Sequence, residues 1–184
     1  MEELSFKHIY GKRTLIIGEV KTGKTKLTAK LLDEAIEMVS PKDITAIDLS
    51  PTIIQEVGRT LSKYTNNVSK VRYLFPEVVR APRLEGKSRD EVLSLAERNR
   101  LVIEPILRSY LINPSKVLFI NDLSIFLHSG SVETVIECME KGSTFIANSY
   151  YGRSIGSDKG SGINRKERAA LKTLFNHINL LIKL

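Results

Sequence analysis

An octapeptide near the start of the chain fits the pattern G-x-x-x-x-G-K-[ST] and constrains the fold more than any other feature. Its residues are Gly18, Glu19, Val20, Lys21, Thr22, Gly23, Lys24 and Thr25. The run from Arg13 to Ile17 before it is short, apolar and β-branched, as a buried strand requires. After it, apolar side chains recur at helical spacing, at Leu27, Leu31, Ala35 and Met38. Strand, loop and helix in this order are the context in which the pattern forms a phosphate-binding loop.

The chemistry expected of this loop follows from its backbone. Gly18 and Gly23 allow dihedral angles that a Cβ would oppose, and they let the chain approach a ligand closely. The N–H groups of the loop then surround a phosphate at the positive end of the following helix. Lys24 is expected to reach the β- and γ-phosphates, and the Thr25 hydroxyl to ligate Mg²⁺. We therefore predict a site for ATP or GTP with Mg²⁺ that runs from Gly18 through Lys26.

Composition favours one soluble domain. A chain of 184 residues fits a single compact unit with a substantial core, so residues 1–184 are assigned to one nucleotide-binding domain. No stretch approaches the roughly 18 consecutive apolar residues of a membrane span. The acidic start, Met1-Glu2-Glu3, lacks the apolar core of a signal peptide, and the single cysteine, Cys138, cannot form an internal disulfide. These features predict a cytoplasmic protein without a membrane partner.

Short apolar runs alternate with helical patterns from residue 13 onward. Strands are expected at 13–17, 44–48, 71–75, 117–120, 144–147 and 178–184, with an edge strand at 4–10. Helices are expected after the octapeptide and after Ser50, Ser88, Ser131 and Asn164. The helix after Ser88 should bury Val92, Leu95, Val102 and Ile106 and break or kink near Pro105. The pattern predicts an α/β fold, a three-layer P-loop NTPase sandwich with a mainly parallel central sheet and ligands at the carboxyl ends of its strands.

A phosphate-binding loop of this kind needs a partner strand that carries an acidic residue near Mg²⁺. The best candidate is the apolar run from Val117 to Ile120, which delivers Asn121 and Asp122 at its carboxyl end. The usual arrangement ends in Asp, often followed by Asp or Glu. Asn121 can accept a hydrogen bond from a metal-bound water but lacks the charge of a carboxylate. Asp122 is therefore expected to serve the Mg²⁺ shell, to orient the attacking water, or both; the alternative is that it caps the next turn.

Polar residues also end two other predicted strands. Asp48 can contact Mg²⁺ or a substrate hydroxyl, or it can act as an N-terminal acid of the helix after Ser50. Asn148 can sense the γ-phosphate, or it can initiate a turn together with Ser149.

Two basic segments are candidates for closing the site. The glycine-rich segment 150–166 can close over the phosphates and supply Arg153 to the developing charge, or it can remain a surface loop. The segment 80–87 can bind a non-nucleotide substrate or stay solvated. The net charge of +7 suits a nucleoside triphosphate, a phosphorylated small molecule or a nucleic acid as partner, although no nucleic-acid-binding motif is present.

The order of these parts resembles the small P-loop nucleoside-triphosphatases of the cancer-related and thermophile NTPase family. The resemblance rests on the short N-terminal strand and on residues 18–25, 104–110 and 117–129, followed by a helix and a strand that ends in Asn148. It implies a single-domain, Mg²⁺-dependent hydrolase of ATP and GTP in which Asn121 and Asp122 occupy the Asp-Glu pair of the family. The layout is also similar to cobalamin adenosyltransferases of the P-loop type and to recombinase-like cores.

The sequence thus predicts a Mg²⁺-dependent nucleoside-triphosphate-binding protein that hydrolyses ATP or GTP. Its catalytic residues would be Lys24, Asp122 and Arg153, with Thr25, Asp122 and Asn121 at the metal. A small-molecule kinase or a nucleotidyl or adenosyl transferase would use the same loop, with Asp48 and residues 80–87 at the acceptor. The other alternative is a nucleotide-dependent nucleic-acid- or protein-binding module with slow hydrolysis. No base-selective Asn-Lys-x-Asp motif is present, so the choice between ATP and GTP stays open.

Overall fold

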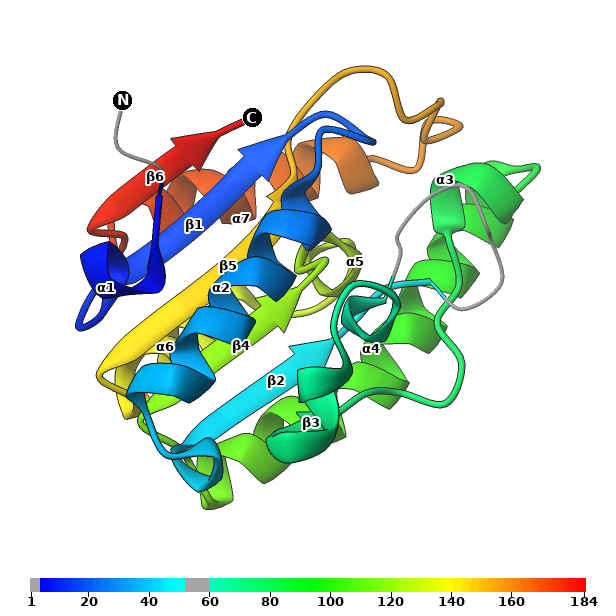
Figure 1. Cartoon of the computed structure of the whole chain (residues 1–184). Coiled ribbons are helices and arrows are strands. Elements are labelled where there is room, and N and C mark those ends of the chain that lie inside the picture. The colour runs from blue at the N-terminus through cyan, green and yellow to red at the C-terminus, as the bar shows by residue number, and fades with distance from the viewer. Residues whose placement is uncertain (1–3, 52–59) are drawn as a thin grey trace.

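The structure is a computed structural model that describes residues 4–51 and 60–184. Within these residues, six strands form one sheet, in the order β3-β2-β4-β5-β1-β6. They are β1 (Arg13–Gly18), β2 (Ile44–Asp48), β3 (Arg72–Leu74), β4 (Val117–Asn121), β5 (Thr144–Tyr150) and β6 (Leu180–Lys183). Every neighbouring pair is parallel, so the carboxyl ends of all these strands meet at one edge of the sheet (Figure 1).

Helices cover both faces of the sheet, which confirms the predicted three-layer α/β sandwich (Figure 1). The helices are α1 (Phe6–Ile9), α2 (Lys24–Met38), α3 (Pro82–Glu85), α4 (Arg89–Ile112), α5 (Ser124–Leu127), α6 (Val132–Lys141) and α7 (Ile163–Phe175). Short 3-10 helices lie at Pro41–Asp43, Leu61–Lys63 and Asn66–Lys70. None of the helices in the described part of the chain is long and apolar enough to cross a membrane.

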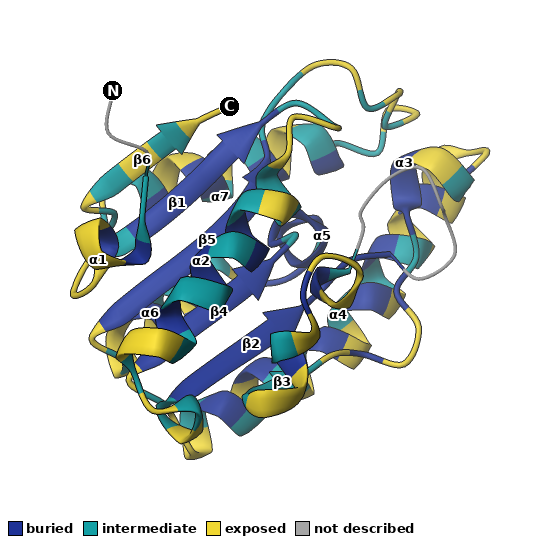
Figure 2. Cartoon of the chain, in the orientation of Figure 1, coloured by how far each residue is buried: buried dark blue, intermediate teal, exposed yellow. Residues whose placement is uncertain are grey.

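Two large apolar clusters, one on each face of the sheet, form most of the core of the described residues, and a small third cluster joins α4 to α7. Because side chains alternate along a strand, Leu15 and Ile17 of β1 face one cluster while Ile16 faces the other. Helices α1 and α2 contribute to the cluster around Ile16, and α4, α5, α6 and α7 contribute to the opposite cluster. Figure 2 shows buried strands between helices whose outer faces are exposed. This two-sided burial explains why the strands are almost continuously apolar in sequence.

The strand order determines which residues meet at the functional edge. Strand β5 lies between β1 and β4, so the phosphate-binding loop after β1 and the acidic end of β4 are separated by the end of β5. On the other side of β4, Asp48 of β2 is paired in register with Asn121. The ends of β5, β4 and β2 therefore form a row of polar residues beside the loop that follows β1.

Two expected elements differ from the structure, and a third lies outside the described residues. Residues 4–10 form no edge strand: α1 buries Phe6 and Ile9, which lie three residues apart on one side of a helical turn. Helix α4 has no break at Pro105, and its buried stripe is offset, with Ile103 buried and Val102 41% exposed. The helix expected after Ser50 falls largely on residues 52–59, which lie outside the described residues.

The side-chain caps predicted at the starts of two helices, at Ser88 and Ser131, are present in the structure. Ser88 Oγ accepts a hydrogen bond from Glu91 N at 3.2 Å, and Glu91 reaches back to the N–H of Lys87 at 2.8 Å. Ser131 caps α6 through Glu133 N at 3.1 Å. The last helix begins one residue before Asn164, with Gly162 at its N-cap.

Candidate functional site

Residues 18–25 connect β1 to α2, as the sequence predicts. Lys21 and Gly23 have left-handed backbone, with φ of 62° and 93°. Gly23 is the N-cap of α2 and offers no side-chain cap, so the first N–H groups of the helix remain available to an anion. Gly18 is required for a different reason: a Cβ at this position would lie 2.5 Å from the carbonyl oxygen of Leu184.

The side chain of Lys24 folds back onto the loop that precedes it. Its Nζ donates hydrogen bonds to the carbonyl oxygens of Gly18, at 3.0 Å, and of Glu19. Burial lowers the pKa of Lys24, and the charges of Asp122 and Glu19 oppose this shift. An ammonium group that is partly desolvated at the mouth of the loop is well placed to bind a phosphate, which would replace the carbonyl contacts.

Glu19 fastens the loop to the segment after β5, a role that the motif did not predict. Its carboxylate accepts hydrogen bonds from the N–H of Arg153 at 2.6 Å and from the hydroxyl of Ser154. The Ser154 and Arg153 hydrogen bonds lower the pKa of Glu19. Gly152 lies so close that a Cβ there would collide with the Glu19 carboxylate, at 2.2 Å. The start of the predicted closing segment is thus attached to the phosphate-binding loop.

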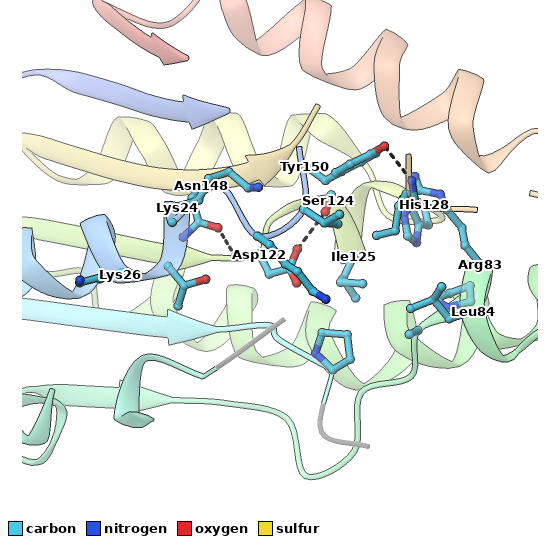
Figure 3. A pocket seen from close by; sticks show the side chains of 18 of the residues that line it. Lys24, Lys26, Arg83, Leu84, Asp122, Ser124, Ile125, His128, Asn148 and Tyr150 are labelled. Carbon is cyan, nitrogen blue, oxygen red and sulfur yellow. Dashed lines mark hydrogen bonds between the residues drawn. The ribbon is translucent and has the colours of Figure 1, made fainter. Parts of the chain in front are cut away.

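A pocket of about 320 Å³ lies at the carboxyl edge of the sheet, between the phosphate-binding loop, the ends of β4 and β5, and α3 (Figure 3). Eight of the predicted site residues line it: Val20, Lys21, Gly23, Lys24, Thr25, Lys26, Asp122 and Asn148. Asn121 and Asp48 do not line this pocket. Arg153 lines a second, smaller cavity of about 190 Å³, which it shares with Arg83 and Arg168.

Asp122 has a strained backbone at the edge of the pocket. Its φ is 58°, a left-handed value that is unfavourable for a non-glycine residue by roughly 1–3 kcal/mol. Its N–H donates to Asn148 Oδ1 at 3.0 Å, and its Oδ1 accepts a hydrogen bond from Ser124 Oγ at 2.9 Å. Helix α5 begins after Leu123 without a side-chain cap, so the Asp122 carboxylate is not the cap of that helix.

The electrostatic surroundings of Asp122 favour a reactive carboxyl group. Burial raises its pKa, whereas the Ser124 hydrogen bond and the positive charge of Lys24 lower it. Lys24 and Asp122 therefore influence each other across the same pocket. A carboxyl group with a raised pKa beside a lysine can orient or deprotonate a nucleophile.

Asn121 and Asp48 belong to a buried polar network beneath the pocket. Asn121 Nδ2 donates to Asp48 Oδ1 at 2.9 Å and to Ser50 Oγ at 2.6 Å. Its Oδ1 accepts from Asn148 Nδ2 at 2.6 Å, and Asn148 Nδ2 also donates to Thr28 Oγ1 at 2.8 Å. The network connects the ends of β2, β4 and β5 with α2 and so fixes the floor of the site.

Asp48 receives hydrogen bonds on both carboxylate oxygens. Oδ2 accepts from Leu61 N at 2.7 Å and from the Tyr73 hydroxyl at 2.7 Å, in addition to the contacts of Oδ1. Burial and the nearby Asp48 carboxylate together raise the pKa of the Tyr73 hydroxyl. These contacts explain why position 121 carries an amide: a second carboxylate there would face Asp48 and would lack the N–H donors that Asp48 needs.

A further group of buried polar residues, which the sequence motifs do not predict, reaches the pocket from three elements. Arg83 of α3 pairs with Glu167 of α7, and its Nε donates to Asn164 Oδ1 at 2.6 Å. His128, which follows α5, contacts Glu167 Oε2 through Nε2 at 3.1 Å. The signal in the sequence is Glu167 itself, which occupies the buried stripe of α7 between Ile163 and Leu171.

The structural comparison agrees with this architecture. The chain is similar to the flagellar accessory protein FlaH from Methanocaldococcus jannaschii, with a TM-score of 0.56 and 13% sequence identity over 95% of this chain and 71% of that chain. A likeness at this identity concerns the fold alone. No protein-family model matches the sequence, and the search of curated proteins also finds no match. The chain thus has the α/β fold of P-loop NTPases, with the glycine-lysine loop at its expected place between β1 and α2.

Proposed function

We propose that the protein binds a nucleoside triphosphate with Mg²⁺ at residues 18–26 and hydrolyses ATP or GTP. The observation that carries this proposal is the position of Lys24 and Asp122 in one pocket, at the open N-terminus of α2. The loop amides and Lys24 would neutralise the phosphates. Asp122 would orient a water toward the γ-phosphate and accept its proton.

The residues at the loop fit Mg²⁺. Thr25 and Asp122, which both line the pocket, offer a hydroxyl and a carboxylate oxygen, the ligand types that Mg²⁺ prefers. No group of three or more His, Cys, Asp or Glu in the described ranges is arranged to hold a metal ion by itself. Mg²⁺ would therefore bind together with phosphate oxygens and waters, as it usually does. When bound, it would neutralise charge on the transferred phosphoryl group.

Asn121 and Asn148 are proposed to act indirectly. Because Asn121 donates to Asp48 and Ser50, we assign it to the support of the site and leave the metal to Thr25 and Asp122. Asn148 accepts the N–H of Asp122, so we propose that it positions this strained residue. In this respect the chain would differ from the cancer-related and thermophile NTPase family that it resembles, because it has Asn121 and Asp122 where that family has an Asp-Glu pair. Arg153, held beside the loop by Glu19, is proposed to move its side chain toward the phosphates.

The experiment measures nucleotide binding and Mg²⁺-dependent phosphate release from ATP and GTP on the same samples. Lys24→Ala should weaken binding, and Asp122→Asn should retain binding but lose turnover by about 10²–10⁴-fold, the usual contribution of a general base. Lys42→Ala, an exposed lysine at the opposite edge of the sheet, serves as the matched control and should behave as wild type. Wild-type protein that binds neither nucleotide would overturn the proposal. Tight binding without turnover would redirect it from hydrolysis to transfer or to a nucleotide-dependent switch.

A further inference from the structure

The pocket extends well past the phosphate-binding loop. Figure 3 shows Lys24, Lys26 and Asn148 toward one end, His128, Arg83 and Leu84 toward the other, and Asp122 and Ser124 between them. We call the second end the far compartment; it is lined by Ala81, Pro82, Arg83, Leu84, Ile125 and His128. In a loop of this type the lysine meets the β- and γ-phosphates. A nucleotide bound there would leave the far compartment open on the side of its γ-phosphate.

The far compartment is mainly apolar and its charges are balanced. Its one cation, among the described residues that form it, is Arg83, which is paired with the buried carboxylate of Glu167. Burial lowers the pKa of Arg83 to about 10, so the guanidinium remains charged at neutral pH and the pair is electrically neutral. A charged ligand group would lose its hydration here without gaining an opposite charge. The compartment therefore fits an uncharged ligand with an apolar body.

His128 adds a specific polar feature to this apolar wall. Its Nε2 contacts the Glu167 carboxylate at 3.1 Å, which places the ring proton on Nε2 and makes Nδ1 an acceptor. Burial lowers the pKa of His128 well below its ordinary value, so the ring is neutral and Nδ1 keeps its lone pair. This buried Nδ1 has no hydrogen-bond partner within the described part of the chain. Such an acceptor is unfavourable until a donor reaches it.

We propose that the far compartment binds a second small molecule, uncharged and largely apolar, whose hydroxyl or amine N–H donates a hydrogen bond to Nδ1 of His128. This ligand would lie beside the γ-phosphate, and in that respect the proposal rests on the proposed nucleotide site. Glu167 and Arg83 act as positioning residues, because Glu167 holds the imidazole in the acceptor form and Arg83 is paired with Glu167. The assignment excludes phosphorylated or carboxylated molecules as occupants.

Three probes with one aromatic ring separate these requirements: benzyl alcohol has a donor, toluene has none, and benzoate carries a negative charge. Binding is followed by backbone amide shifts in the ¹⁵N-labelled full chain, with Leu84, Ile125 and Ile155 as reporters. Benzyl alcohol should bind about fivefold more tightly than toluene, the factor expected for one added hydrogen bond, and benzoate should bind most weakly. Preferred binding of benzoate, equal binding of the alcohol and toluene, or no shift with any probe would overturn the proposal.

The imidazole itself gives the second readout. The ¹⁵N resonance of His128 Nδ1 should move on addition of benzyl alcohol and not of toluene, and this measurement needs no variant. His128→Phe keeps a ring but removes the acceptor, so it should abolish the preference for the alcohol while toluene still binds. His177→Phe, at a histidine outside the pocket, is the control and should keep the preference.

Nucleotide binding is measured on the same variants to separate this proposal from the proposed function. If wild type binds the alcohol but no nucleotide, the far compartment stands and the phosphate site fails. If His128→Phe weakens nucleotide binding as strongly as Lys24→Ala, the compartment holds the nucleoside, and the second-ligand proposal fails while the nucleotide site stands.

Discussion

Replacing Asn121 by Asp tests the reasoning about the floor of the site. The substitution restores the residue usual at this position but puts a carboxylate where Nδ2 now donates to Asp48 Oδ1, at 2.9 Å, and to Ser50 Oγ, at 2.6 Å. A hydrogen bond to a charged acceptor contributes roughly 1.5–3 kcal/mol and one to a neutral acceptor roughly 0.5–1.5 kcal/mol. The ionised side chain of Asn121→Asp can donate neither bond, so in that form the free energy of unfolding should be lower by about 2–4 kcal/mol.

The charge adds a pH-dependent part to this loss. Two carboxyl groups in contact cannot both ionise easily, so the folded variant retains a proton that the unfolded chain releases. Its folded state then binds more protons than its unfolded state, and its stability falls as pH rises, by about 1.4 kcal/mol for each unit by which the pKa is raised. Wild type, with an amide at this position, lacks this contribution.

Urea unfolding at pH 5, 6.5 and 8 measures both parts. At a slope of roughly 2 kcal/mol/M, the midpoint of Asn121→Asp should lie about 1–2 M below wild type, with the larger gap at pH 8. Asn121→Ala is the matched control, because it removes the same donors without adding a charge and should show a gap that does not change with pH. An Asn121→Asp protein as stable as wild type at pH 8 would refute the argument that Asp48 dictates the amide.

Two further predictions concern stability. Gly18→Ala should lower the free energy of unfolding by about 1–3 kcal/mol through collision with the Leu184 carbonyl, whereas Gly11→Ala, where φ is 76° and no atom lies within 4 Å, should lose only about 1 kcal/mol. Thermal unfolding compares them, and a harmless Gly18→Ala would contradict the close approach. For His128, burial holds the pKa well below 6.5, so only the unfolded chain takes up a proton as pH falls below that value. Wild-type stability should therefore drop by about 1 kcal/mol more than that of His128→Phe between pH 6.5 and 5.5, as measured by urea unfolding, while His177→Phe should follow wild type. Equal pH profiles for all three proteins would mean that His128 titrates normally in the fold.

Local patterns were sufficient to predict much of the fold. Buried parallel strands are apolar in sequence, so β1, β2, β4 and β5 were recognisable, and the glycine-lysine motif correctly predicted a strand, a loop and a helix at β1 and α2. Strand order was not readable, because no local signal says that β5 separates β1 from β4. The prediction of a strand at residues 4–10 was wrong for a related reason. The apolar residues of this segment fit an alternating pattern, but packing against α2 favours a helical turn that buries Phe6 and Ile9.

In the candidate site, too, residues marked by a local pattern could be predicted, whereas contacts between distant segments could not. Asp122 was predictable because it directly follows an apolar strand, but its left-handed backbone is set by Asn148 of a different strand. The group formed by Arg83, His128 and Glu167 comes from segments far apart in the sequence, so its assembly could not be predicted, although Arg83 lies in the segment 80–87 that was considered for substrate binding. Glu167 is recognisable as a charged residue on an apolar helical stripe, which indicates a buried partner.

The strand order explains why the chain has Asn121 where an Asp is usual. Because β2 lies directly beside β4, position 121 faces Asp48 and serves the network that joins the strand ends. The next residue, Asp122, projects its carboxylate into the pocket instead, and it does so through a backbone conformation that is unfavourable without support. That support comes from Asn148, whose oxygen holds the Asp122 N–H while its nitrogen holds Asn121. Asp122 and Asn121 are thus both held by hydrogen bonds to Asn148. A change at Asn148 should therefore disturb both the buried polar network and the position of Asp122.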